Sequence, residues 1–207
     1  VINHGETHFE RLRDLANGLV VTFGGDSKAD FNPENAKFKL KLPGEYNILN
    51  GLAAIAVTNI FGVDPRKAVK TLENFFGLEG RMQEVENKLG IKIVIDFAHT
   101  PNALENALLT LKKEKHGKLI SVFGCAGLSD VEKRPLMGEV SAKLADITVI
   151  TAEDPRGEID KIDEQYINGA KKAGGIEGKN VYIENDRQKA IELAVNKLAR
   201  KGDIVGI

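Results

Sequence analysis

Short apolar runs alternate with helical patterns along the second half of the chain. Runs rich in β-branched residues predict five strands, at residues 91–95, 119–123, 147–151, 181–183 and 204–207. After Pro101, four apolar residues share one face of a helix: Leu104, Ala107, Leu108 and Leu111. Strands that alternate with helices predict an α/β fold whose parallel sheet is covered on both faces.

Prolines and capping residues predict where the helices begin. Pro135 stands like a first-turn proline, and Asp186 can cap a helix that stops before Gly202. The first half is less regular, with a predicted strand at 19–23, an apolar helix at 47–61 and a second helix opened by Asp64-Pro65. The pattern breaks at residues 76–81, which predicts two domains, 1–80 and 81–207.

Composition and charge exclude several classes of protein. The chain has 207 residues, 29% of them charged and 42% hydrophobic, with a formal net charge of -1, as in ordinary soluble globular proteins. This balance provides no overall field for binding nucleic acid or an anionic membrane. No apolar run approaches the roughly 20 residues of a membrane helix, and no signal peptide is visible. Cys125 is the only cysteine, so we expect no internal disulfide and a cytoplasmic location.

Charged residues follow the predicted strands at the points where each strand ends. Asp96 and His99 follow the first strand, Lys133 and Arg134 close the loop after the second, and Glu153-Asp154-Pro155-Arg156 follows the third. Ligands of open parallel sheets bind beyond these carboxyl ends. The alternatives are structural: Asp96 can cap a helix, a lone histidine is more often part of the structure, and charged loops are mostly solvated. Cys125 is interpreted as an inert small residue.

One segment of the chain partly matches the pattern of a phosphate-binding loop. Residues 174–180, GGIEGKN, are the nearest match to G-x-x-x-x-G-K-[ST], but they are one residue short and lack the hydroxyl side chain. They also precede a strand instead of following one. The sequence therefore predicts no self-sufficient triphosphate site.

Five segments in order resemble the Mur ligase family. They are GEYNILN at 44–50, GRM at 80–82, DFAHTP at 96–101, the loop from 124 to 138 with its KRPLMG ending, and EDPR at 153–156. The closest resemblance is to UDP-N-acetylmuramoyl-tripeptide synthetase (MurE type), and it covers nearly the whole chain. Five motifs in register are far more specific than any one of them.

The resemblance implies a fold and a reaction. Residues 1–80 would be the later part of the family's central ATPase domain, and 81–207 its C-terminal, Rossmann-like domain, truncated at the end. The implied reaction is ATP- and Mg²⁺-dependent amide formation: the third amino acid is added to UDP-N-acetylmuramoyl-L-Ala-D-Glu in peptidoglycan synthesis, and so serves cell-wall biogenesis, cell shape and division. The uridine-nucleotide domain, P-loop and metal-binding lysine are absent, so we expect an inactive fragment. The implied partners are small molecules, with neither nucleic acid nor membrane, and the implied state is a monomer.

The family motifs also imply binding residues. On the nucleotide side they are Asn47, Asn50, Arg81, Asp96 and His99, with Asp96 accepting hydrogen bonds from ribose hydroxyls. No catalytic residue and no metal ligand is assigned within this chain.

Three further residues are implied for the incoming amino acid: Arg134, Asp154 and Arg156. An arginine fork matches a carboxylate bidentately, which favours meso-diaminopimelate as first choice and L-lysine as second. Two departures stand against the family pattern: Leu128-Ser129 replaces an acid and an arginine, and Asp154 replaces an asparagine. The open alternatives are a related amide ligase, like folylpolyglutamate or cyanophycin synthetase, and a non-catalytic ligand-binding or assembly module.

Overall fold

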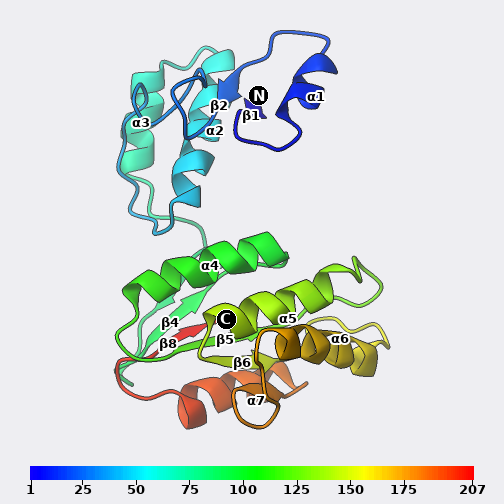
Figure 1. Cartoon of the computed structure of the whole chain (residues 1–207). Helices are drawn as coiled ribbons and strands as arrows, with labels where there is room; N and C mark the ends of the chain where they lie inside the picture. Colours follow the sequence, from blue (N-terminus) through cyan, green and yellow to red (C-terminus); the bar gives the residue numbers. More distant parts are fainter. The chain divides into compact units, whose positions relative to one another are not determined.

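The computed structural model describes all residues from Val1 to Ile207 and divides into two compact units (Figure 1). The first unit is Val1–Gly77 and the second is Leu78–Ile207. The division falls three residues before the boundary predicted after residue 80, within the same Gly-rich break in the pattern. None of the helices combines the length and the apolar character that crossing a membrane would require.

Helices make up most of the regular secondary structure of the first unit. Its elements are β1 (Ile2–Asn3), α1 (Phe9–Asp14), β2 (Thr22–Phe23), α2 (Tyr46–Ile60) and α3 (Pro65–Glu73), with β1 and β2 paired in parallel. Leu52 and Ile55 on α2 are fully buried in its core. The predicted helices are confirmed, and the side chain of Asp64 caps α3 by accepting from the N–H of Arg66 at 2.8 Å. The strand predicted over 19–23 is shorter than expected.

The second unit contains a six-stranded sheet. Its strands are β3 (Gln83–Val85), β4 (Lys92–Ile95), β5 (Leu119–Phe123), β6 (Ile147–Ile150), β7 (Val181–Ile183) and β8 (Ile204–Gly206), in the order β3-β4-β8-β5-β6-β7. All neighbouring pairs are parallel except β3 with β4. The five predicted strands are confirmed. β3 was not predicted, because two of its three residues are exposed polar side chains without an apolar alternation.

Helices cover both faces of this sheet. They are α4 (Pro101–Glu114), α5 (Lys133–Leu144), α6 (Ile159–Lys172) and α7 (Arg187–Glu192), which continues as the π-helix η1 (Leu193–Leu198). In Figure 1, α4, α5 and α6 lie on one face and α7 on the other. This follows from right-handed crossovers, because the chain steps one way from β4 to β7 and returns to place β8 between β4 and β5.

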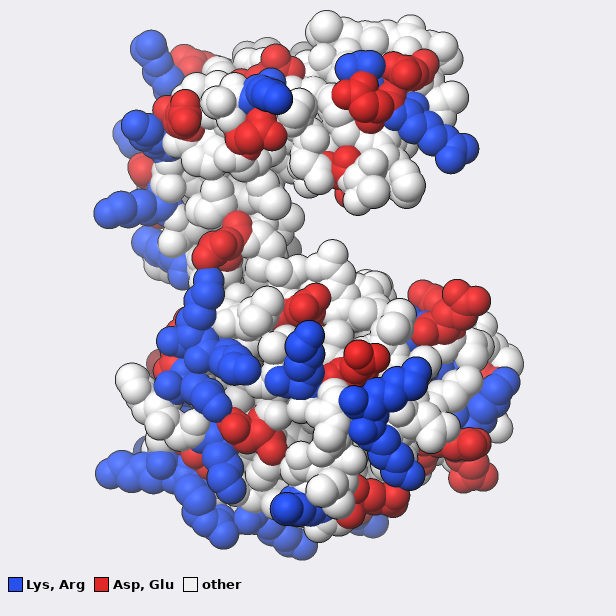
Figure 2. Space-filling model, viewed as in Figure 1, with Lys and Arg blue, Asp and Glu red and all other residues white.

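Local signals in the sequence position the helix starts. Thr100 caps α4 by accepting from the N–H of Ala103, with Pro101 as the first helical residue, and Asp186 caps α7 by accepting from the N–H of Lys189. Because β4 to β8 are parallel, their carboxyl ends meet at one edge of the sheet, and the helices begin beside that edge. Figure 2 shows Lys and Arg gathered on the opposite side of the unit, where α4 ends with two lysines in its last turn.

Candidate functional site

The end of β4 carries a partly buried carboxylate. Oδ2 of Asp96 accepts from the backbone N–H of Met82 at 2.9 Å. Burial raises the pKa of Asp96, and the N–H of Met82, the charge of Arg81 and the N–H of Ala98 offset only part of that effect. The charged form of Asp96 is therefore disfavoured by burial at the carboxyl edge of the sheet. Such a perturbed pKa is typical of functional positions.

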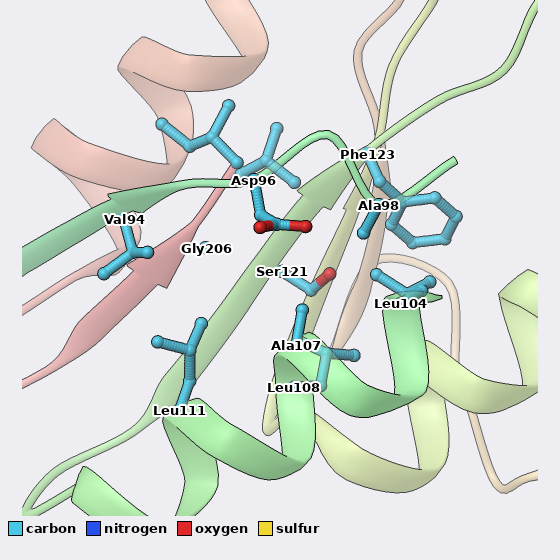
Figure 3. A pocket seen from close by; sticks show the side chains of 12 residues that line it. Val94, Asp96, Ala98, Leu104, Ala107, Leu108, Leu111, Ser121, Phe123 and Gly206 are labelled. Atoms are coloured by element: carbon cyan, nitrogen blue, oxygen red, sulfur yellow. The ribbon is translucent and has the colours of Figure 1, made fainter. Parts of the chain in front are cut away.

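A small cavity lies beneath Asp96. In Figure 3 its carboxylate points toward the hydroxyl of Ser121, across a space of about 40 Å³ enclosed by the sheet and α4. The Ser121 hydroxyl is buried and has no hydrogen-bond partner. Ligand pockets for molecules of cofactor size occupy about 300–1,000 Å³, so this cavity is too small for a nucleotide or an amino acid. The cavity itself therefore cannot hold either ligand.

An exposed aromatic side chain, Phe97, follows Asp96 in the chain. The ring of Phe97 is 55% exposed, and the guanidinium carbon of Arg81 lies 4.6 Å from its centroid. The imidazole of His99 lies 4.9 Å from the same centroid at an interplanar angle of 59°. Sequence reasoning singled out Arg81 and His99 but missed Phe97, whose signal was an aromatic residue directly after the acid at a strand end.

The loop after β5 is tied to this cluster and to the loop after β6. Nζ of Lys133 donates to the backbone oxygen of His99 at 2.9 Å. The N–H of Gly127 donates to the backbone oxygen of Asp154 at 2.7 Å. A side chain on Gly124 would overlap the backbone oxygen of Thr151, so only glycine permits this approach. The structure thus brings the three predicted segments together at one edge.

Arg134 lies in the first turn of α5 and is completely buried. Its Nη1 donates to Oε1 of Gln165 at 2.9 Å, and its Nη2 donates to Oε2 of Glu158 at 2.9 Å. Its Nε has no partner. Contact between Arg134 and a substrate carboxylate remains a prediction, and it requires the segment covering the guanidinium to move.

Asp154 and Arg156 lie at the surface. Oδ2 of Asp154 accepts from Nε of Arg156 at 2.8 Å, and the two side chains are 57% and 49% exposed. Arg156 has a left-handed backbone with φ of 47°. Because Asp154 uses only Nε, the terminal nitrogens of Arg156 have no partner in the structure and stay accessible to a ligand.

Asn47 and Asn50 belong to the first unit. Both lie in the first turns of α2, where Nδ2 of Asn47 donates to the backbone oxygen of Pro43 at 2.7 Å. Nδ2 of Asn50 donates to Oδ1 of Asn47 at 3.1 Å, and Asn50 is exposed. The two asparagines therefore act as one hydrogen-bonded pair, in a unit separate from the other candidate residues.

The chain has no cluster of side chains that could bind a metal ion. No group of three or more His, Cys, Asp or Glu residues lies close enough to share a metal ion. Cys125 is buried as a free thiol.

The chain is similar in sequence and in fold to known proteins. Residues 80–207 match the family described as Mur ligase, glutamate ligase domain. The chain is 36% identical to a UDP-N-acetylmuramoyl-L-alanyl-D-glutamate--2,6-diaminopimelate ligase of Aquifex aeolicus. The aligned region covers 100% of this chain and 45% of the relative. It is 38% identical to the ligase of the same name from Synechocystis, over 98% of this chain and 44% of the relative.

A solved structure of a 2,6-diaminopimelate ligase of that name superposes with a TM-score of 0.55 at 27% identity, covering 100% of this chain and 46% of the other. The chain thus spans less than half the length of the relatives that it matches. The family match covers the larger part of the chain and includes the whole candidate edge of the sheet. The chain belongs to the Mur ligase family.

Proposed function

We propose that this chain is part of an ATP-dependent ligase that adds the third amino acid to UDP-N-acetylmuramoyl-L-Ala-D-Glu during peptidoglycan synthesis in the cytoplasm. The observation that carries the proposal is the similarity of nearly the whole chain to ligases named for 2,6-diaminopimelate. Meso-diaminopimelate is the first choice of amino acid and L-lysine the second. The chemistry would be phosphorylation of the dipeptide carboxylate by ATP, attack of the amino group on the acyl phosphate, and loss of phosphate.

The two units would take different parts in this reaction. Residues 1–80 would be the later part of a central ATP-binding domain and 81–207 a domain that brings in the amino acid. In the first unit, Asn47 and Asn50 would be nucleotide-binding residues for the adenine side. In the second unit, Arg81 and Asp96 would be nucleotide-binding residues for the ribose and phosphate side, and His99 for the side near the base. The exposed ring of Phe97 supports this role, because an aromatic face beside Arg81 suits a flat base.

The amino acid would bind at the loops after β5 and β6. Arg156 would receive its distal carboxylate through the two terminal nitrogens left by Asp154, and Asp154 would face the amino group at that end. Arg134 would bind the amino acid only after the segment that covers its guanidinium moves. Magnesium would accompany ATP, with most of its ligands outside this chain, and we expect the 207-residue chain alone to be inactive and monomeric.

The test is Arg156→Ala in the complete enzyme. Losing a charge-assisted bidentate contact costs about 1.5–3 kcal/mol, so the KM for the amino acid should rise at least about tenfold. The KM for ATP should stay near that of the natural protein. Arg66→Ala is the matched control, since Arg66 is exposed on α3 and its side chain has no polar partner. An equal rise in both KM values would exclude Arg156 as the amino-acid contact.

The alternatives make different predictions in the same assay. A relative of folylpolyglutamate or cyanophycin synthetase would release ADP with folate or peptide acceptors and not with the UDP-linked dipeptide. A non-catalytic module would release no ADP with any acceptor, and calorimetry would detect neither ATP nor amino acid.

A further inference from the structure

Glu158 joins three segments of the second unit through one carboxylate. Its Oε2 accepts from the backbone N–H of Leu128 at 2.7 Å and from Nη2 of Arg134 at 2.9 Å. Its Oε1 accepts from Nζ of Lys161 at 3.3 Å. Glu158 precedes α6, yet its side chain does not cap that helix. An acid at a helix start usually serves its own helix, whereas this one reaches across to the loop after β5 and to α5.

Both loops that meet at Glu158 contain residues with left-handed backbones. Leu128, whose N–H donates to Glu158, has φ of 55°, and Arg156 has φ of 47°. A non-glycine residue in this region is strained and persists only where its surroundings hold it. The backbone N–H of Glu158 also donates to the backbone oxygen of Pro155 at 2.8 Å, which closes the turn that carries Arg156. Glu158 therefore fixes one loop with its side chain and the other with its main chain.

Glu158 is also the charged partner of Arg134. A buried guanidinium needs a counter-charge, and Arg134 is 0% exposed. The N–H of Leu128 and the guanidinium of Arg134 lower the pKa of Glu158 to about 2. The carboxylate is therefore ionised throughout the neutral range and acts as a fixed charge, so proton transfer is not its role.

We propose that Glu158 is a positioning residue for the amino-acid substrate, holding the loop after β5 and Arg134 in place relative to Arg156. This deepens the proposed ligase function and rests on it. Glu158 acts through these neighbours and does not itself contact the amino acid. A displacement of about 1 Å in a substrate-binding group can cost about a hundredfold in rate, so a fixed support behind the arginines has a direct effect on the reaction.

The experiment is Glu158→Gln in the complete enzyme. The amide keeps the size of the side chain and one acceptor oxygen but loses the charge that pairs with Arg134. We expect the KM for the amino acid to rise about tenfold, as for the loss of one hydrogen bond to a charged group, and the KM for ATP to change less than about twofold. Glu164→Gln makes the same chemical change at an exposed position of α6 without a polar partner and should leave both values unchanged.

A second measurement uses the 207-residue chain itself. Hydrogen exchange of the Leu128 amide should be faster in Glu158→Gln than in the unmodified chain and unchanged in Glu164→Gln. If Glu158→Gln does not fold, Glu158→Asp keeps the charge on a shorter side chain and should raise the amino-acid KM by a smaller factor.

The outcomes are distinct. An unchanged amino-acid KM, or an equal rise in the KM for ATP, overturns the positioning role. A lower amino-acid KM also overturns it, because Glu158 would then be a competitor of the substrate for Arg134. If the unmodified complete enzyme forms no amide, the proposed function fails; faster exchange at Leu128 would then still show that Glu158 holds the loop.

Discussion

Asp96 directly follows β4 and Glu158 directly precedes α6, so both carboxylates lie at the carboxyl edge of the same sheet. Their surroundings act on them in opposite directions. Burial raises the pKa of Asp96, whereas the Leu128 N–H and the Arg134 guanidinium lower the pKa of Glu158 to about 2. The first carboxylate is ionised at a cost, and the second is stabilised by being ionised.

This difference indicates that the two carboxylates have different roles at the same edge of the sheet: one binds a ligand and the other supports the structure. Asp96 accepts hydrogen bonds from the backbone N–H groups of Met82 and Ala98 and has an exposed aromatic neighbour, and its carboxylate retains acceptor capacity for a ligand. Glu158 has three donors, one of them a buried arginine, and little capacity left. A carboxylate with unused acceptor sites suits ligand binding, and one whose sites are filled suits support.

The largest expected effect on stability comes from the close backbone packing of the loops near Glu158, which the region near Asp96 does not have. A methyl group on Gly127 would overlap the carbonyl oxygen of Pro155, so Gly127→Ala must push apart the loops after β5 and β6. We expect a loss of about 2–3 kcal/mol in the free energy of unfolding, measured with urea. Gly80 is the matched position on the side of Asp96, where an added methyl group would meet no atom within 4 Å. Gly80→Ala should therefore lose only the about 1–2 kcal/mol that a side chain costs at a φ of +69°. Equal losses would show that the loops are not in close backbone contact.

The next effect concerns the pH dependence of stability. A carboxyl group whose pKa falls from 4.5 to about 2 on folding stabilises the folded state above pH 4.5 and loses that contribution as the pH falls toward 2. Glu158→Gln should therefore lower the melting temperature at neutral pH. The difference in melting temperature between Glu158→Gln and the unmodified chain should become steadily smaller below pH 4.5. A difference that is constant with pH would mean that the charge of Glu158 contributes nothing.

Local interactions decided how far the sequence could predict this edge. β5 was predicted with the correct bounds because five consecutive apolar or small residues are buried, and the Thr100 and Asp186 caps act within three residues. Arg134 could not be understood in the same way. Its partner Glu158 is 24 residues away, and its burial depends on how α5 and α6 pack. A sequence shows an arginine in a charged loop but not whether the fold covers it.

The smallest expected effect on stability is at Asp96, and it completes the comparison. An acid whose pKa is raised above 3.8 by folding makes the protein less stable as the pH rises through that range, because the buried charge is unfavourable. Asp96→Asn removes this charge and keeps an oxygen for the N–H of Met82. Its melting temperature at neutral pH should therefore equal that of the unmodified chain or slightly exceed it. The same substitution in the complete enzyme should weaken ATP binding, since an amide oxygen accepts more weakly from ribose hydroxyls than a carboxylate. If Asp96→Asn instead destabilised the chain as much as Glu158→Gln, Asp96 would also be a structural support, and the division of work between the two carboxylates would be wrong.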